Sequence, residues 1–193
     1  GSIFDLRESL LKIKAAGSFL TETELYQLGK TLVSAAEICD YFTEEKSAAY
    51  PLLKQIADSL LCFPEISRHI DSILDKFGNI KDNASPELQQ LRRKLLSVSS
   101  SVNGMMQRVI SRYKQNGMLD KDCTPSIRDG RLVIPVAPMH KRAVKGIVHD
   151  ESATGKTFFI EPEEIVEANN QIRELEADIH KEIVRILIMT ADI

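Results

Sequence analysis

Two stretches with the spacing of long packed helices constrain the fold most. In the first, apolar residues alternate spacings of three and four without a break. They are Leu88, Leu91, Leu95, Val98, Val102, Met105 and Val109. Nearly the same spacing returns in the last part of the chain, at Ile165, Ala168, Ile172, Leu175, Ile179, Ile186 and Met189. The two stretches predict a pair of long helices that pack against each other in antiparallel directions.

Both helices have start signals. Ser85, Pro86 and Glu87 supply an N-cap, a first-turn proline and an acid that faces the positive end of the helix. The second helix is expected to follow Pro162, with three acids in its first turn. They are Glu161, Glu163 and Glu164.

The residues before 85 are predicted to form four or so packed helices. Thr21 and Glu24 have the spacing of a capping box ahead of an apolar helical pattern. Pro51 and Pro64 stand where a helix can begin, and apolar spacing follows each of them. Turn-forming residues at 77–84 end this part of the chain. We therefore expect a helical core domain over residues 1–84.

Between the two long helices the pattern becomes strand-like. Asp129 and Gly130 tolerate positive φ, so they predict a two-residue hairpin turn. Further short strands are expected at 132–136, 146–149 and 157–160. The predicted fold is mainly α: a helical core and a long antiparallel helix pair that carries a small β-rich module. The outgoing helix is assigned to residues 85–120, the module to 121–161 and the returning helix to 162–193.

The composition is that of a folded chain, with 43% apolar and 27% charged residues. The sequence contains neither a signal peptide nor a long apolar run, so we expect a cytoplasmic protein without a membrane partner. Cys39, Cys62 and Cys123 are an odd number of cysteines at irregular spacings. They predict free thiols, with no disulfide and no zinc site.

Both ends suggest an excised piece of a longer protein. Gly1 and Ser2 resemble the remnant of a cleaved expression tag, and no Met precedes Ile3. Residues 183–193 still have a helical pattern without a Gly or Pro to stop it.

Charge is distributed unevenly along the sequence. From Arg108 to Lys156 there are ten Lys and Arg against five acids, a net charge of +5, whereas the whole chain is −3. A basic module on an acidic body favours binding to nucleic-acid phosphates, and a solvated basic surface is the alternative. The candidate phosphate-binding residues are Arg128, Arg131, Lys141, Arg142, Lys145 and Lys156.

Two of these candidates lie opposite each other in the predicted hairpin. Arg128 and Arg131 flank its two-residue turn, where like charges repel. An anion is therefore expected nearby. Asp129 is one candidate, and a bound phosphate is the better one.

The segment at 150–157 differs from a nucleotide-binding P-loop only at its first glycine. Asp150 stands there, and a carboxylate would repel phosphate. The segment also leads into a predicted strand, whereas a P-loop leads into a helix. His149, Asp150 and Ser152 suggest a catalytic triad, but adjacent residues of a strand point to opposite faces. We expect no catalytic residue, no bound cofactor and no metal site, and so no enzyme in this piece alone.

Three strings carry a resemblance to a known family. They are SIRDGRLVIPV at 126–136, GIVHDESATGKTFFIEP at 146–162 and VEANN at 166–170. Together they resemble the bacterial MutS-II family, the MutS homologues that lack the mismatch-reading domain and usually carry a C-terminal Smr domain. Residues 137–140 depart from the family's common sequence.

The resemblance implies that the helix pair forms levers and that the β-module forms a DNA-encircling clamp. Full-length relatives are ATP-driven homodimers that bind branched DNA, suppress recombination and nick DNA through the Smr domain. Some act on stalled ribosomes. The ATPase with its ATP and Mg²⁺, and the Smr endonuclease, would lie beyond residue 193.

The prediction is therefore a non-catalytic lever and clamp piece that binds DNA phosphates without sequence preference. The alternatives are a clamp that binds the ribosome and a purely structural helical scaffold.

Overall fold

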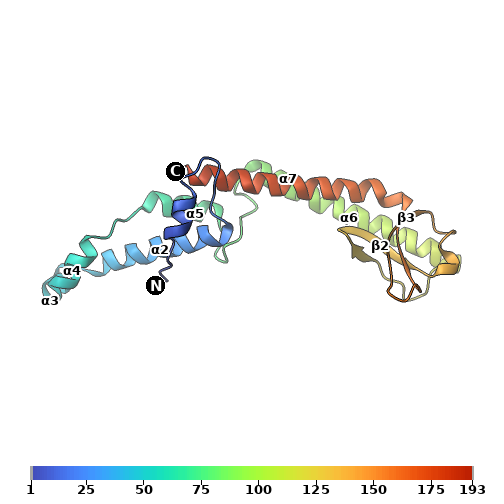
Figure 1. Ribbon diagram of the computed structural model, residues 1–193, viewed down its shortest axis with the longest axis horizontal. Coiled ribbons are helices and arrows are strands. Elements are labelled where there is room, and N and C mark those ends of the chain that lie inside the picture. The colour runs from blue at the N-terminus through green and yellow to red at the C-terminus, as the bar shows by residue number, and fades with distance from the viewer. Residues whose placement is uncertain (1, 193) are drawn as a thin grey trace. The chain divides into compact units, whose positions relative to one another are not determined.

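A computed structural model describes residues 2–192, so Gly1, where a tag remnant was predicted, lies outside the described residues. The chain divides into two compact units. The first unit contains the residues up to Gln89 together with those from His180 onward, and the second contains Gln90–Ile179. The structure is mainly helical with one small antiparallel sheet, which confirms the predicted fold class at this level (Figure 1).

The first unit is built from short and medium helices. Its complete helices are α1 (Arg7–Lys12), α2 (Glu22–Tyr41), α3 (Glu44–Ala49), α4 (Pro51–Asp58) and α5 (Pro64–Ile73). The predicted capping box is present at the start of α2, where Glu24 N–H donates to Thr21 Oγ1 and Thr21 N–H donates to a Glu24 carboxylate oxygen. Proline begins both α4 and α5, as predicted.

Helices α2 and α5 pack on each other, but α4 does not bury its apolar residues. Leu52, Leu53 and Ile56 are 74%, 54% and 64% exposed. Ala57 is the one buried residue of α4. The prediction that this helix packs through its apolar positions is therefore wrong within the described residues, because these side chains face solvent and only Ala57 is covered.

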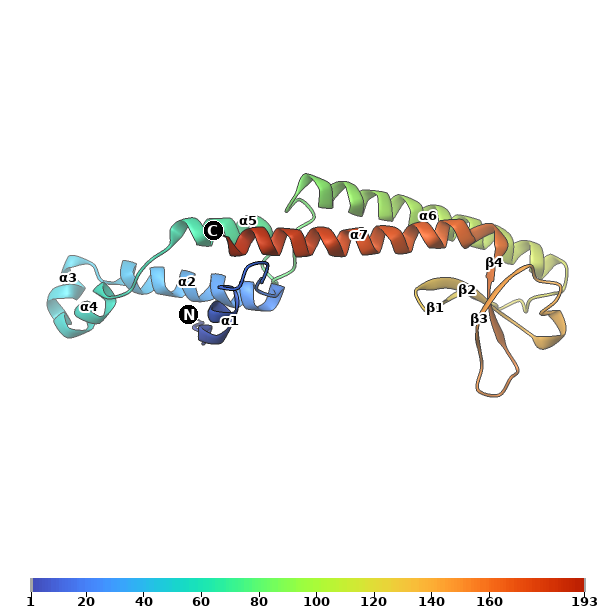
Figure 2. The same cartoon turned by 45° about the horizontal axis from the view of Figure 1, so that its top comes forward.

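Two long helices continue from the first unit into the second. They are α6 (Pro86–Gln115) and α7 (Val166–Ala191). Within the second unit they run antiparallel and side by side, as both views show (Figures 1 and 2). The main core of that unit lies between α6 and the sheet, and Ala168 and Ile172 of α7 pack against it. Its buried residues are Val102, Met106, Val109, Ile110, Tyr113, Leu119, Ile134, Val136, Val144, Ile160 and Ile165.

The buried stripe of α6 differs in part from the predicted one. Val102 and Val109 are buried as predicted, but Met106 is fully buried and Met105 only partly. A helix repeats every 3.6 residues, so a stripe of spacing 3.5 drifts around its axis. The sheet also covers α6 here, and the widened buried face takes in Ile110.

The sheet has four antiparallel strands in the order β1-β2-β4-β3. The strands are β1 (Ser126–Arg128), β2 (Arg131–Val136), β3 (Gly146–Glu151) and β4 (Phe158–Pro162), and a 3₁₀ turn, η1 (Pro138–His140), follows β2. The predicted hairpin turn is confirmed, because Asp129 and Gly130 have φ of 48° and 72°.

The chain enters α7 later than its sequence pattern predicted. Glu161 and Pro162 end β4, and a 3₁₀ turn, η2 (Glu163–Ile165), precedes the helix. Placing Glu161 in the first helical turn was therefore wrong. Its side chain is fully buried instead. None of the helices in the described residues is long and apolar enough to cross a membrane.

Two glycines of the second unit make a matched pair for testing this packing. A Cβ on Gly146 would lie 2.1 Å from the carbonyl oxygen of Glu161, whereas a Cβ on Gly104 would meet no atom within 4 Å. We expect Gly146→Ala to lower the unfolding free energy by about 1–3 kcal/mol, since β3 must move away from β4. Gly104→Ala should raise it by about 0.5–1 kcal/mol, because alanine favours a helix interior.

Urea unfolding followed by circular dichroism measures both effects. A Gly146→Ala chain as stable as the parent chain would contradict the close approach of β3 to β4.

Candidate nucleic-acid interface

The six candidate phosphate-binding residues lie on three connections of the sheet. Lys141, Arg142 and Lys145 are in the β2–β3 connection, and Lys156 is in the β3–β4 turn. All four are exposed. Arg128 and Arg131 flank the β1–β2 turn and are only partly exposed. These two arginines therefore differ in exposure from the other four candidates.

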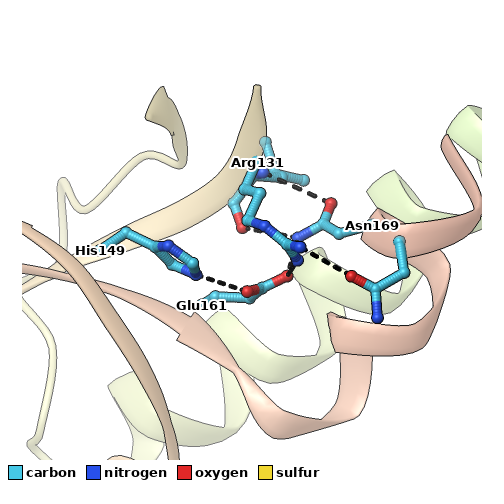
Figure 3. Close-up of polar contacts among 6 residues, drawn as sticks. Arg131, His149, Glu161 and Asn169 are labelled. Carbon is cyan, nitrogen blue, oxygen red and sulfur yellow. Dashed lines mark hydrogen bonds and ion pairs between the residues drawn. The ribbon is translucent and has the colours of Figure 1, made fainter. Parts of the chain in front are cut away.

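Arg131 contacts a buried carboxylate of the same unit. Its Nη1 donates to Glu161 Oε1 at 2.8 Å, and its Nη2 donates to Asn170 Oδ1 at 2.7 Å (Figure 3). The Glu161 side chain is 0% exposed and that of Arg131 is 18% exposed. An ionised carboxylate without solvent needs a compensating charge, and Arg131 supplies it.

Helix α7 completes this contact. Asn169 Nδ2 donates to Glu161 Oε1 at 2.7 Å and to the Leu132 carbonyl at 3.2 Å, while Leu132 N–H donates to Asn169 Oδ1 at 3.4 Å. One asparagine of α7 thus binds the backbone of β2 and the carboxylate of β4. We call Arg131, His149, Glu161, Asn169 and Asn170 the Glu161 network.

His149 joins the network from an irregular position of β3. The register between β3 and β4 shifts between Val148 and Asp150, and His149 is the extra residue there. Its Nε2 lies 2.5 Å from Glu161 Oε2 (Figure 3). Bulges redirect side chains in this way. His149 and Asp150 have different partners, because His149 contacts Glu161 and Asp150 contacts Arg128.

The network also sets the ionisation of Glu161. Burial by itself would raise the pKa of this carboxyl group. Hydrogen bonds from Asn169, His149 and Arg131 outweigh the burial and hold its pKa below the ordinary value. Glu161 is thus ionised at neutral pH although its side chain is out of solvent.

Arg128 has its own partners on the neighbouring strands. Its Nε lies 3.2 Å from Asp150 Oδ2, and its guanidinium lies 4.1 Å from the ring centre of Phe159. Arg128 and Arg131 do pair across the hairpin, as predicted. However, Asp150 and Glu161 supply the expected anions, so neither Asp129 nor a phosphate is required to balance the pair.

Sequence reasoning missed four members of the Glu161 network. His149 was considered only as a strand residue and as a triad candidate, and Glu161 only as an acid at the start of a helix. Asn169 and Asn170 stand side by side in a helix, where asparagine is a poor helix former. Two asparagines in a packed helix indicate polar partners, and that signal could have identified them.

The β2–β3 connection is the most strongly cationic part of the sheet. Residues 137–145, which we call the cationic loop, contain three Lys and Arg and no acid. The loop is fixed from beneath, because Val144 is buried and Lys145 N–H donates to Tyr113 Oη at 3.2 Å. Lys141 Nζ lies 3.8 Å from the ring centre of Phe158. Its cations are therefore displayed on an ordered turn.

Three of these exposed cations form no direct ion pair in the described residues, although the charge of Lys145 acts on Glu164. In residues 2–192, the side chains of Arg142, Lys145 and Lys156 form no ion pair with an Asp or Glu. They differ in this from Arg128 and Arg131. Their charge is available to an anionic ligand.

The net charge of the unit is smaller than the sequence count indicated. Glu161 and Glu164 lie just after the counted stretch and pair with Arg131 and Arg112. The second unit, Gln90–Ile179, has 14 Lys and Arg against 12 Asp and Glu, a net charge of +2, and the first unit has −5. The excess positive charge of this unit lies on α6, which has six Lys and Arg and no acid from residue 90 onward, and on the cationic loop, which has three and no acid.

The P-loop-like string forms a hairpin connection. It joins β3 to β4, and three of its amides already have partners: Ser152 N–H donates to the Thr157 carbonyl, Gly155 N–H to the Ser152 carbonyl and Thr157 N–H to Ser152 Oγ. A P-loop needs such amides free to bind phosphate. Among the described residues, no group of three or more His, Cys, Asp or Glu is placed to hold a metal ion.

Comparisons with known proteins identify the family. No family model matches the chain. Proteins named "Endonuclease MutS2" match nearly all of it: 38% identical over 183 residues in Pelotomaculum thermopropionicum, 35% over 190 in Halalkalibacterium halodurans and 31% over 192 in Alkaliphilus oremlandii. The matches cover 95%, 97% and 99% of the chain. The chain belongs to the MutS2 family.

The predicted resemblance to MutS-II proteins is thereby confirmed. The MutS2 chain spans about a quarter of the length of these relatives, because the matches cover 23% to 24% of them. The Glu161 network and the cationic loop both lie inside the matched part.

Removing the buried charge tests the role of the Glu161 network in this MutS2 chain. Glu161→Gln keeps the shape of the side chain but leaves Arg131 without a counter-charge. We expect the unfolding free energy to fall by about 3 kcal/mol, the cost of breaking a buried pair. Urea unfolding measures it, with Glu163→Gln, an exposed neighbour, as the matched control. Equal stability of the two variants would contradict the account.

The same variant changes the pH dependence of stability. The pKa of Glu161 is lowered in the folded chain, so its ionised form contributes stability above the ordinary carboxyl pKa. That contribution is lost as the pH falls from about 4.5 through the folded-state value. Glu161→Gln should therefore lose less stability over this acidic range than the parent chain does. An identical loss in both would show that Glu161 does not titrate as described.

The hairpin at 152–157 leads to a separate prediction about nucleotides. Because the amides of Ser152, Gly155 and Thr157 are already hydrogen-bonded within the hairpin, we expect no tight binding of ATP. Equilibrium titration with a fluorescent ATP analogue tests this. Saturable micromolar binding that disappears in Lys156→Ala would contradict it.

Proposed function

We propose that this MutS2 chain is a non-catalytic lever and clamp segment that binds DNA through its backbone phosphates. Helices α6 and α7 would act as levers, and the four-stranded sheet would be the clamp module. The ATPase and endonuclease activities, with ATP and Mg²⁺ as cofactors, and assembly into a homodimer belong in this proposal to the full-length protein. The name of the relatives, endonuclease MutS2, supports a function on DNA.

The observation that carries the proposal is the cationic loop. It places Lys141, Arg142 and Lys145 on one ordered connection without an acid in it. Cations of this kind gain affinity by releasing counterions from a nucleic acid. Lys156 adds a fourth exposed cation on another turn of the same sheet.

The proposed binding is independent of base sequence. Lysine ammonium groups bind phosphates as point charges, and phosphate contacts carry no sequence information. Arg128 and Arg131 are the two candidates with fork-shaped side chains on the sheet's hairpin, and both are engaged by Asp150 and Glu161. Arg142 is the one exposed arginine among the candidates, so the two lysines of the same loop and Lys156 favour backbone binding over base reading.

A salt series with a triple variant tests the proposal. The variant Lys141→Ala/Arg142→Ala/Lys145→Ala removes three phosphate partners. We expect weaker binding to a DNA duplex and a plot of log affinity against log salt that is flatter by about two to three units. Fluorescence anisotropy with two duplexes of unrelated sequence measures both quantities. The parent chain should bind the two duplexes equally.

The matched control changes the same charge elsewhere. Lys14→Ala/Arg68→Ala/Lys76→Ala removes two lysines and one arginine, all exposed, from the first unit. This variant should keep the parent slope. If both triple variants flatten the plot of log affinity against log salt by the same amount, binding follows net charge alone and the proposed interface is wrong. Affinities that depend on base sequence would contradict the phosphate-only mode.

A further inference from the structure

Two cysteine side chains of the first unit lie in contact. Sγ of Cys62 is 3.2 Å from Sγ of Cys39. Cys39 lies near the end of α2, and Cys62 lies in the connection between α4 and α5. Their 23-residue separation in the sequence gave no sign of this contact.

The two thiols differ in their surroundings. Cys62 is exposed, while Cys39 is partly buried. The Cys39 thiol donates to the carbonyl of Ala57 at 3.8 Å, and Ala57 is itself buried. The hydrogen bond with Cys62, followed by burial and the charge of Asp40, raises the pKa of the Cys39 thiol. A reagent in solution therefore reaches Cys62 first, with Cys39 directly behind it.

We propose that Cys39 and Cys62 are a reversible oxidation site that forms an intramolecular disulfide with a small-molecule disulfide as oxidant. In the first step the Cys62 thiolate attacks one sulfur of the oxidant. The oxidant's sulfur–sulfur bond breaks, a mixed disulfide forms on Cys62, and one small thiol leaves.

In the second step Cys39 completes the bond. Its thiolate attacks Sγ of Cys62, and the second small thiol leaves. Two protein thiols are oxidised, one small disulfide is reduced to two thiols, and the two protons pass to those thiols. The protein sulfurs must approach to about 2.05 Å, and Cys62 lies in a loop that can supply this movement.

The bond would fasten a loosely attached segment. It closes residues 40–61, which include α3 and α4, and Ala57 is the one buried residue of these two helices. The third cysteine, Cys123, packs against the core of the second unit, and burial raises its pKa. Oxidation should therefore select the pair over Cys123.

Oxidation of the native chain tests the proposal. The chain is treated with glutathione disulfide, and its thiols and intact mass are then measured. We expect loss of two of the three thiols without added glutathione mass. After cleavage by trypsin at Lys46 or Lys54, which lie inside the closed segment, the fragments should stay joined until a reductant is added. Bond formation should be on the order of tenfold or more faster in the native chain than in urea, because folding holds the thiols together.

Single variants separate the possible outcomes. Cys123→Ser should behave like the parent chain, while Cys39→Ser should stop at a stable glutathione adduct on Cys62. A stable adduct on the parent chain would overturn the proposal. So would a bond to Cys123, a bond between chains, or equal rates in native buffer and in urea.

Discussion

The second unit depends on keeping one ionised carboxylate, that of Glu161, out of water. Such a group is tolerated only when a cation and several hydrogen bonds replace its hydration. Arg131 comes from β2, His149 from β3 and Asn169 from α7, so the compensation requires three elements at once. Because Asn169 also binds the backbone of β2, satisfying Glu161 fixes where the sheet meets the helix. The polar contacts thus specify the arrangement of sheet and helix. The apolar core beneath the sheet stabilises that arrangement through the burial of apolar surface, which has no preferred direction.

The same constraint sorts the basic residues into two groups. Arg131 is bound to Glu161, and Arg128 is bound to Asp150 and stacked on Phe159. Their charge serves the fold. In the part of the chain that the structure describes, the exposed cations of the cationic loop and Lys156 form no ion pair with an Asp or Glu. A charge count over residues 108–156 does not separate these two groups. It omits Glu161 and Glu164, which lie later in the sequence and pair with Arg131 and Arg112 in the fold. The proposed interface is therefore narrower than the basic stretch of the sequence.

Much of the fold could be predicted because it follows from local rules. The prolines that begin α4 and α5, the capping box of α2 and the Asp129-Gly130 turn depend on neighbouring residues, and all are present. The failures concern long-range partners. Glu161 resembled a first-turn helix acid because three acids surround Pro162, and nothing local indicates that a strand will bury it. The contact between Cys39 and Cys62 likewise depends on how α2 meets the α4–α5 connection. The apolar pattern of α4 predicted burial. That prediction was wrong because a pattern alone does not show which surface will cover the apolar residues.

Side-chain NMR during a DNA titration tests this division of the basic residues most directly. A ¹⁵N-labelled chain is titrated with an unlabelled duplex, while backbone amides and arginine Nε signals are followed. The amide signals of the cationic loop should shift with added DNA. The Nε signal of Arg131 should stay in place, because the Arg131 guanidinium remains bound to Glu161. A shift of the Arg131 signal together with unchanged loop amides would contradict the account.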